Sequence, residues 1–167
     1  MHVLVIAASK NGATAGIADE IACALGEAGV AADVADIGRP VRVGDYDAVV
    51  LGSAVYMGRW LDPASRFATA HAAELRRVPV WLFSSGPIGS PPRPAESQPA
   101  HVGELLEVTG AREHRTFAGR IERGRLSLPQ RALMRAMHVS EGDYRDWDAV
   151  RAWARDIAAA LSPQRVG

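Results

Sequence analysis

The segment Ser9-Lys10-Asn11-Gly12-Ala13-Thr14 carries the residue types most suited to binding chemistry. It follows an apolar run and precedes an alanine-rich stretch, which places it between a strand and a helix. Hydroxyl and amide side chains beside a glycine, at a helix N-terminus, favour an anion such as phosphate. An ordinary capped turn between a strand and a helix would use the same residues. From this segment alone, both interpretations stay open.

Other chemistries are poorly supported by the sequence. Lys10 is not part of a glycine-lysine-serine or threonine ending, so a nucleoside triphosphate is disfavoured. There is no dinucleotide fingerprint, no defensible serine-histidine-acid arrangement and no zinc-ligand spacing, so no metal is expected. We interpret His71, His101, His114 and His138 as surface or packing residues. Any catalysis should therefore belong to a bound cofactor.

Apolar runs alternate with helical patterns, which predicts an α/β fold with a parallel sheet covered on both faces. Strands are expected at 3–8, 31–37, 48–51, 78–84 and 114–118. Helices are expected from 13 to 28, from 62 or 63 to 76, from 102 to 109, from 129 to 138 and from 146 to 161. The loops after the first, third and fourth strands would then meet at the carboxyl edge of the sheet, where ligands bind in such folds.

Two segments resemble the flavodoxin family. Ser9 to Thr14 matches the family's phosphate loop, T/S-x-T-G-x-T, with Asn11 in place of the middle hydroxyl. Tyr46 to Ser53 resembles its third strand, and Ala54 to Gly58 its first loop around the isoalloxazine ring. The resemblance implies a flavodoxin-like three-layer sandwich, with a five-stranded parallel sheet of order 2-1-3-4-5 and helices on both faces. It also implies FMN as the cofactor.

Within that superfamily, the chain is most similar to the menaquinone-dependent protoporphyrinogen oxidase branch. The likeness continues through Phe117-Ala118-Gly119, an arginine-rich insertion at about 119–145, and Glu141 to Trp147. The branch places a tyrosine just before the ring-loop glycine, where this chain has Met57. The resemblance implies a quinone-linked FMN oxidoreductase, with a quinone or a redox protein as partner. The alternative is a flavodoxin-type electron-transfer protein without its own substrate.

Two loops are expected to surround the flavin ring, which needs an aromatic face and backbone donors. The first ring loop is Ser53-Ala54-Val55-Tyr56-Met57-Gly58, and the second is Ser84-Ser85-Gly86-Pro87-Ile88-Gly89. Tyr56 is the best stacking candidate, and Met57 and Trp60 are further candidates to line the ring. Trp81 lies within a predicted strand and is expected in the core.

The charges near the predicted ring differ from those of acidic electron shuttles of the family. From Ser53 to Leu61 the only charged residue is Arg59, and from Ser84 to Ala95 it is Arg93. A positive charge near the ring favours the reduced anion by Coulomb attraction. We therefore expect a higher flavin potential than in acidic flavodoxins.

Composition narrows the remaining possibilities. The chain has 167 residues, which predicts a single domain over 1–167. Its formal net charge is zero, which argues against nucleic-acid binding. The only cysteine, Cys23, falls opposite the apolar stripe of its helix, and no run is apolar enough to span a membrane, so a cytoplasmic protein is expected.

The arginine-rich segment has two interpretations. Residues 120–138 combine arginines with leucines and methionines, a pattern typical of an element that lies on an anionic membrane. Such an element would place the protein peripherally at the inner face of the membrane. A solvated insertion that packs its leucines on the sheet explains the same residues equally well. The sequence does not give the oligomeric state.

Overall fold

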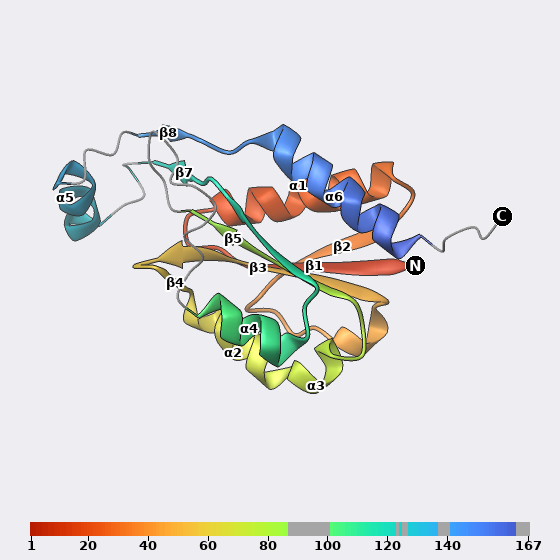
Figure 1. Cartoon of the computed structure of the whole chain (residues 1–167). Helices are drawn as coiled ribbons and strands as arrows, with labels where there is room; N and C mark the ends of the chain where they lie inside the picture. Colours follow the sequence, from red (N-terminus) through yellow and green to blue (C-terminus); the bar gives the residue numbers. More distant parts are fainter. Residues whose placement is uncertain (87–100, 123, 125–126, 137–140, 163–167) are drawn as a thin grey trace.

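A parallel sheet forms the centre of the computed structural model (Figure 1). The structure describes residues 1–86, 101–122, 124, 127–136 and 141–162. The parallel strands are β1 (His2–Ala8), β2 (Ala31–Asp36), β3 (Ala48–Tyr56), β5 (Val80–Ser85) and β6 (Glu113–Phe117). Their order across the sheet is β2-β1-β3-β5-β6, which confirms the predicted order 2-1-3-4-5. Three short strands lie outside this prediction: β4 (Arg59–Trp60), which pairs with β3, and β7 (Arg120–Ile121) and β8 (Gly142–Asp143), which pair with each other.

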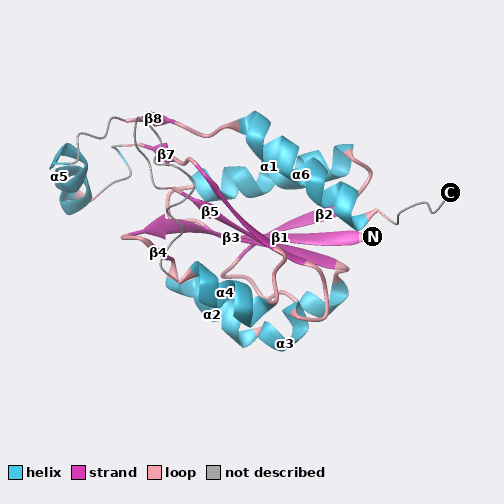
Figure 2. Cartoon of the chain, in the orientation of Figure 1, coloured by secondary structure: helices cyan, strands magenta, loops and turns pink. Residues whose placement is uncertain are grey.

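Helices cover both faces of the sheet (Figures 1 and 2). One face carries α1 (Ala13–Glu27) and α6 (Trp147–Leu161). The other carries α2 (Asp62–Ala70), α3 (Ala72–Leu75) and α4 (Val102–Thr109), and a short 3-10 turn spans Val43–Asp45. The helix α5 (Leu128–Ala136) lies apart from both layers, beyond the edge where β4 is found (Figure 1). The predicted flavodoxin-like three-layer sandwich is therefore confirmed.

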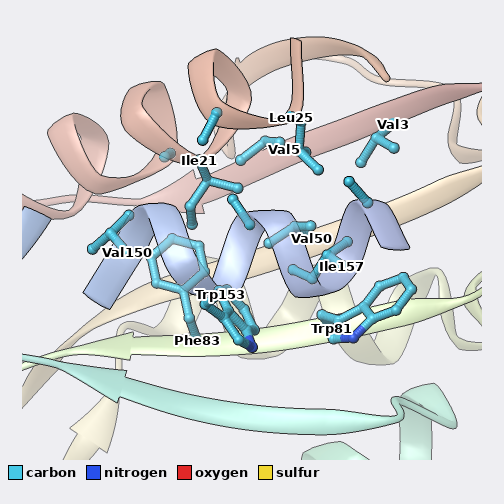
Figure 3. Packing of buried hydrophobic residues seen from close by; sticks show 14 of the residues in the cluster. Val3, Val5, Ile21, Leu25, Val50, Trp81, Phe83, Val150, Trp153 and Ile157 are labelled. Atoms are coloured by element: carbon cyan, nitrogen blue, oxygen red, sulfur yellow. The ribbon is translucent and has the colours of Figure 1, made fainter. Parts of the chain in front are cut away.

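The core between the sheet and the α1 and α6 layer is built around aromatic side chains (Figure 3). Phe83, Phe117 and Trp153 contact one another with ring centroids 5.5–6.3 Å apart. Gly52 in β3 leaves room for this cluster, because a Cβ there would lie 2.2 Å from ring carbons of Phe83. Trp81 is 4% exposed in the same cluster, as predicted.

Two expectations about the elements need correction. The third strand continues to Tyr56 instead of ending at 51, because β4 pairs with its last residues. The predicted helix to residue 76 breaks at His71, whose backbone has φ −102° and ψ 15° and whose ring contacts Phe67 and Glu74. The helix predicted over 129–138 spans Leu128–Ala136, and 137–138 lie outside the described residues.

Two further features concern the molecule's surface. Cys23 is exposed and unpaired, as its position opposite the apolar stripe predicted. Within the part of the chain that the structure describes, no helix is long and apolar enough to cross a membrane.

Candidate functional site

The phosphate loop, residues 9–14, joins β1 to α1 at the carboxyl edge of the sheet. Gly12 has φ 82°, a conformation that favours glycine, and its N–H donates to Oγ of Ser9 at 3.0 Å. The N-cap residue of α1 is Gly12, which has no side chain to cap the first turn of the helix. The first amides of a helix have no partner within it, so those of Ala13 and Thr14 face the loop. These donors suit an anion with several acceptor oxygens.

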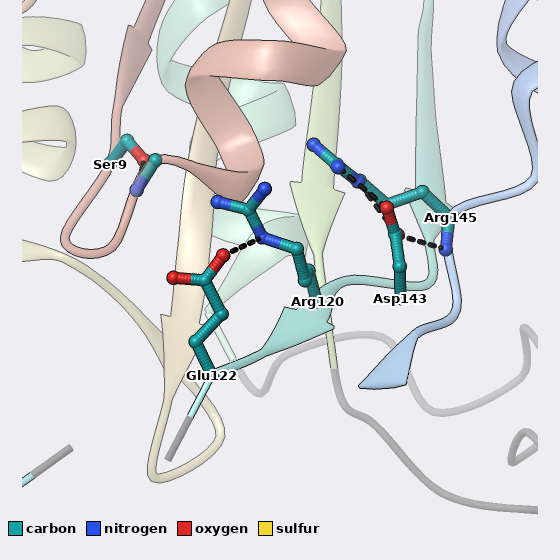
Figure 4. A network of polar contacts seen from close by, with 6 residues as sticks. Ser9, Arg120, Glu122, Asp143 and Arg145 are labelled. Carbon is teal, nitrogen blue, oxygen red and sulfur yellow. Dashed lines mark hydrogen bonds and ion pairs between the residues drawn. The ribbon is translucent and has the colours of Figure 1, made fainter. Parts of the chain in front are cut away.

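Two arginines on the β7 and β8 hairpin lie beside this helix start (Figure 4). Arg145 donates to both carboxylate oxygens of Asp143, at 2.8 and 2.7 Å, and its pairing keeps the pKa of Asp143 below its usual value. A Cβ at Gly16 would lie 2.6 Å from Nη1 of Arg145, so the guanidinium packs against the first turn of α1. Arg120 pairs with Glu122 at 3.1 Å. The hairpin thus places two arginine–carboxylate ion pairs next to the start of α1.

The first ring loop, residues 53–58, is the end of β3 and a tight turn, and not the open loop that the sequence suggested. Met57 and Gly58 form the turn with φ 52° and 75°, values that match the two central residues of a two-residue hairpin. Tyr56 is 42% exposed and Met57 75% exposed. Nζ of Lys10 lies 4.7 Å from the centroid of the Tyr56 ring, so the phosphate loop and the first ring loop meet at this side chain.

A buried polar network lies beneath the first ring loop. Trp60 is 3% exposed, and its indole N–H donates to Oγ of Ser84 at 2.7 Å. The same Ser84 oxygen lies 2.7 Å from Nε2 of His114. Oγ of Ser53 accepts from the backbone N–H of Leu61 at 3.0 Å. The hydroxyls of Ser53 and Ser84 therefore have protein partners, and the buried indole of Trp60 holds the hairpin against β5.

Two histidines of this region have pKa values below that of a free imidazole. Burial lowers the pKa of His114 to about 4. Neutral Nε2 can accept the Ser84 hydroxyl proton, because Ser84 already accepts from the Trp60 indole. Burial and then the charge of Arg59 lower the pKa of His101, whose Nε2 accepts from the backbone N–H of Trp60 at 3.1 Å. Both rings fasten the β3–β4 hairpin to neighbouring elements.

The second ring loop is described only at its start. Ser85 is 5% exposed, and Gly86 has φ 98°. The N–H of Gly86 donates to the carbonyl of Phe117 at 2.9 Å, so this amide already has a hydrogen-bond partner within the protein. Pro87, Ile88 and Gly89 lie outside the described residues. The assignment of this loop to the ring stays a prediction.

Sequence reasoning missed three contacts that shape the site. The contacts of Trp60 and His114 gave no local signal, since their shared partner Ser84 is distant in sequence and is met only in the fold. Gln130 of α5 donates from Nε2 to the Tyr56 hydroxyl at 3.0 Å. The only sequence signal for Gln130 is its spacing of three from Ser127, typical of a helix N-terminus.

The fold and the helix end together define an α/β protein with a candidate phosphate site at the switch point of its sheet. Residues 4–148 match the flavodoxin domain family, so the chain belongs to the flavodoxin family. Members of this family bind FMN, and the donors at the start of α1 fit its phosphate.

Similar proteins agree with this assignment. The chain is 27% identical over 172 residues to protoporphyrinogen IX dehydrogenase [quinone] of Escherichia coli, covering 95% of each chain. An archaeal flavodoxin superposes with a TM-score of 0.64 at 15% identity, covering 96% of this chain and 98% of its own. Flavodoxin 1 of Bacillus cereus gives 0.62 at 18% identity, covering 97% and 100%. The two solved structures support the flavodoxin fold.

Proposed function

We propose that this protein is an FMN-dependent oxidoreductase that passes electrons from an organic donor of the protoporphyrinogen type to a quinone. The observation that carries the proposal is the start of α1, where Gly12 makes no side-chain cap, beside a β3–β4 hairpin that holds Arg59 and no carboxylate. The similarity to the quinone-linked dehydrogenase covers 95% of both chains, and so includes the insertion. The bound flavin would supply the redox chemistry.

Different residues of the chain would bind the phosphate and the ring of FMN. Ser9, Gly12 and Thr14 with the free amides of α1 would hold the phosphate. Tyr56 would stack on the flavin ring, since it is exposed and stands on a hairpin fixed by Trp60. Ala54, Val55 and Met57 would add backbone contacts of the first ring loop. Lys10 and Arg59 would bring positive charge toward the ring.

Anaerobic turnover tests the enzymatic part of this proposal. Purified protein loaded with FMN should oxidise a porphyrinogen only when a menaquinone analogue is present. A flavodoxin-type carrier is the second candidate, and the flavodoxin structures similar to this chain favour it. A carrier would exchange electrons with a redox protein and leave the porphyrinogen unchanged. That result would refute the enzymatic proposal.

A redox titration tests the role of charge near the ring. Arg59→Gln should lower the flavin potential, because a positive charge that favours the reduced anion is removed. Arg66→Gln is the matched control, since Arg66 is also exposed but lies on α2. Equal potentials in the Arg59→Gln variant and the wild type would contradict this part of the proposal.

The insertion would bring the protein to a membrane-borne quinone. On α5, Leu128 and Leu133 are 78% and 45% exposed, and Arg131 and Arg135 are exposed beside them. Exposed leucines with arginines favour contact with anionic lipid. Co-sedimentation with phosphatidylglycerol vesicles should fall when Leu128 and Leu133 are both changed to serine. Sedimentation equal to that of the wild type would argue for a solvated insertion.

A further inference from the structure

Helix α5 reaches the first ring loop through one buried side chain. Gln130 is 9% exposed, whereas the other α5 side chains that the structure describes are exposed. Its Nε2 donates to the hydroxyl of Tyr56 at 3.0 Å, across 74 positions of sequence. A buried amide on an otherwise exposed helix indicates a specific contact, because burying a polar group is favourable only when it is hydrogen-bonded.

The orientation of the Gln130 amide is fixed by the start of its own helix. The backbone N–H of Ser127 donates to Oε1 of Gln130 at 2.9 Å, and the N–H of Gln130 donates to Oγ of Ser127 at 3.4 Å. This reciprocal pair is a capping box. Since Oε1 must accept from Ser127, the NH2 group must face Tyr56. The phenol oxygen therefore accepts, and its own proton stays available to donate.

Neither neighbour of Tyr56 can take that proton. Gln130 presents only N–H donors to the phenol, and the ammonium of Lys10 above the ring has no lone pair. Among the described residues, none accepts a hydrogen bond from the Tyr56 hydroxyl, and the side chain is 42% exposed. The proton is thus directed to whatever docks beside the first ring loop.

We propose that Gln130 is a positioning residue that holds Tyr56 as a hydrogen-bond donor for the carbonyl oxygen of a quinone acceptor. The inference rests on the proposed function for its acceptor, but the polarity of the Gln130–Tyr56 bond is independent of any cofactor. A quinone oxygen gains negative charge as it is reduced. A donating phenol with Lys10 nearby stabilises that charge.

Gln130→Glu tests the polarity of this bond. A glutamate keeps the shape and the capping box with Ser127. Its carboxylate can only accept a hydrogen bond, so the Tyr56 hydroxyl must donate to it. The hydroxyl can then no longer donate to the quinone. Ultraviolet resonance Raman of the apoprotein should show Tyr56 as an acceptor in the wild type and as a donor in the variant. Tyr56→Phe identifies the signal, and Ala132→Glu adds the same charge on an exposed α5 position.

Steady-state kinetics with the quinone test whether the Tyr56 hydroxyl donates its proton to the quinone oxygen. Gln130→Glu and Tyr56→Phe should each raise KM for the quinone about tenfold, the loss of one hydrogen bond, and combining them should add nothing. The FMN affinity of Gln130→Glu and the quinone KM of Ala132→Glu should stay within about twofold of the wild type.

The outcomes test the positioning role of Gln130 and the proposed function separately. An unchanged Raman signal in Gln130→Glu overturns the positioning role, whether or not the protein binds FMN. A changed signal with an unchanged quinone KM overturns the donation to quinone. Failure to bind FMN or to reduce quinone defeats the proposed function, and the Raman signal still decides whether Gln130 sets the polarity of Tyr56.

Discussion

Acidification should destabilise the folded protein through His114. Burial lowers the pKa of this ring from 6.5 to about 4, while in the unfolded chain it returns to its ordinary value. Between these values only the unfolded state binds the proton, so the free energy of unfolding falls as pH falls. From about pH 7.5 to about pH 5, linkage gives at most about 2 kcal/mol. Partial exposure of the ring reduces the expectation to about 1.5 kcal/mol.

Urea unfolding of the apoprotein at both pH values measures this loss. In His114→Gln the loss from about pH 7.5 to about pH 5 should be smaller than in the wild type by about 1.5 kcal/mol, because the titrating group is gone. His71→Gln is the matched control: His71 lies at the α2–α3 junction, paired with Glu74, and the control should keep the wild-type loss. If His114→Gln and the wild type lose the same stability, His114 is not held neutral by the fold and the reasoning is wrong.

Three further predictions concern packing and backbone. Gly52→Ala should cost about 2–3 kcal/mol in urea unfolding, because its Cβ would overlap the ring of Phe83, and Phe83→Leu should recover part of that loss; full stability of the single variant would contradict the packing. Asp146→Ala removes the carboxylate that accepts from Ala149 N–H at the start of α6, and should lower stability by about 1 kcal/mol in thermal unfolding; an unchanged Tm would exclude the cap. Met57→Asn should stabilise the protein by about 0.5 kcal/mol, because asparagine tolerates φ 52° better; destabilisation would argue that Met57 makes contacts of its own.

The sequence predicted the elements with strong periodicity. The apolar run of β1 and the stripe of α1 were placed within about one residue, and the order of the five parallel strands was correct. These features depend on local pattern and on topology that resemblance to a family supplies. The break at His71 was missed because an alanine-rich segment continues the helical pattern on both sides of it.

The parts of the site that the sequence did not predict depend on contacts between distant residues. The turn at Met57 and Gly58 lacks the usual Asn-Gly signal, so the sequence predicts a loop where the structure has the β3–β4 hairpin. The hydrogen bonds of Ser84 to His114 and Trp60 had no signal in the sequence, because these residues lie on three different strands. Such pairings follow from the packed sheet and not from the type of either residue alone.

The most direct test of the account compares two flavins that differ only in the phosphate. Titration calorimetry of the apoprotein should show that FMN binds more tightly than riboflavin, and that Ser9→Ala and Thr14→Val weaken FMN but leave riboflavin nearly unchanged. Ser65→Ala on α2 should change neither affinity. Equal losses for both flavins in the loop variants, or equal affinities in the wild type, would contradict the claim that the start of α1 holds the cofactor phosphate.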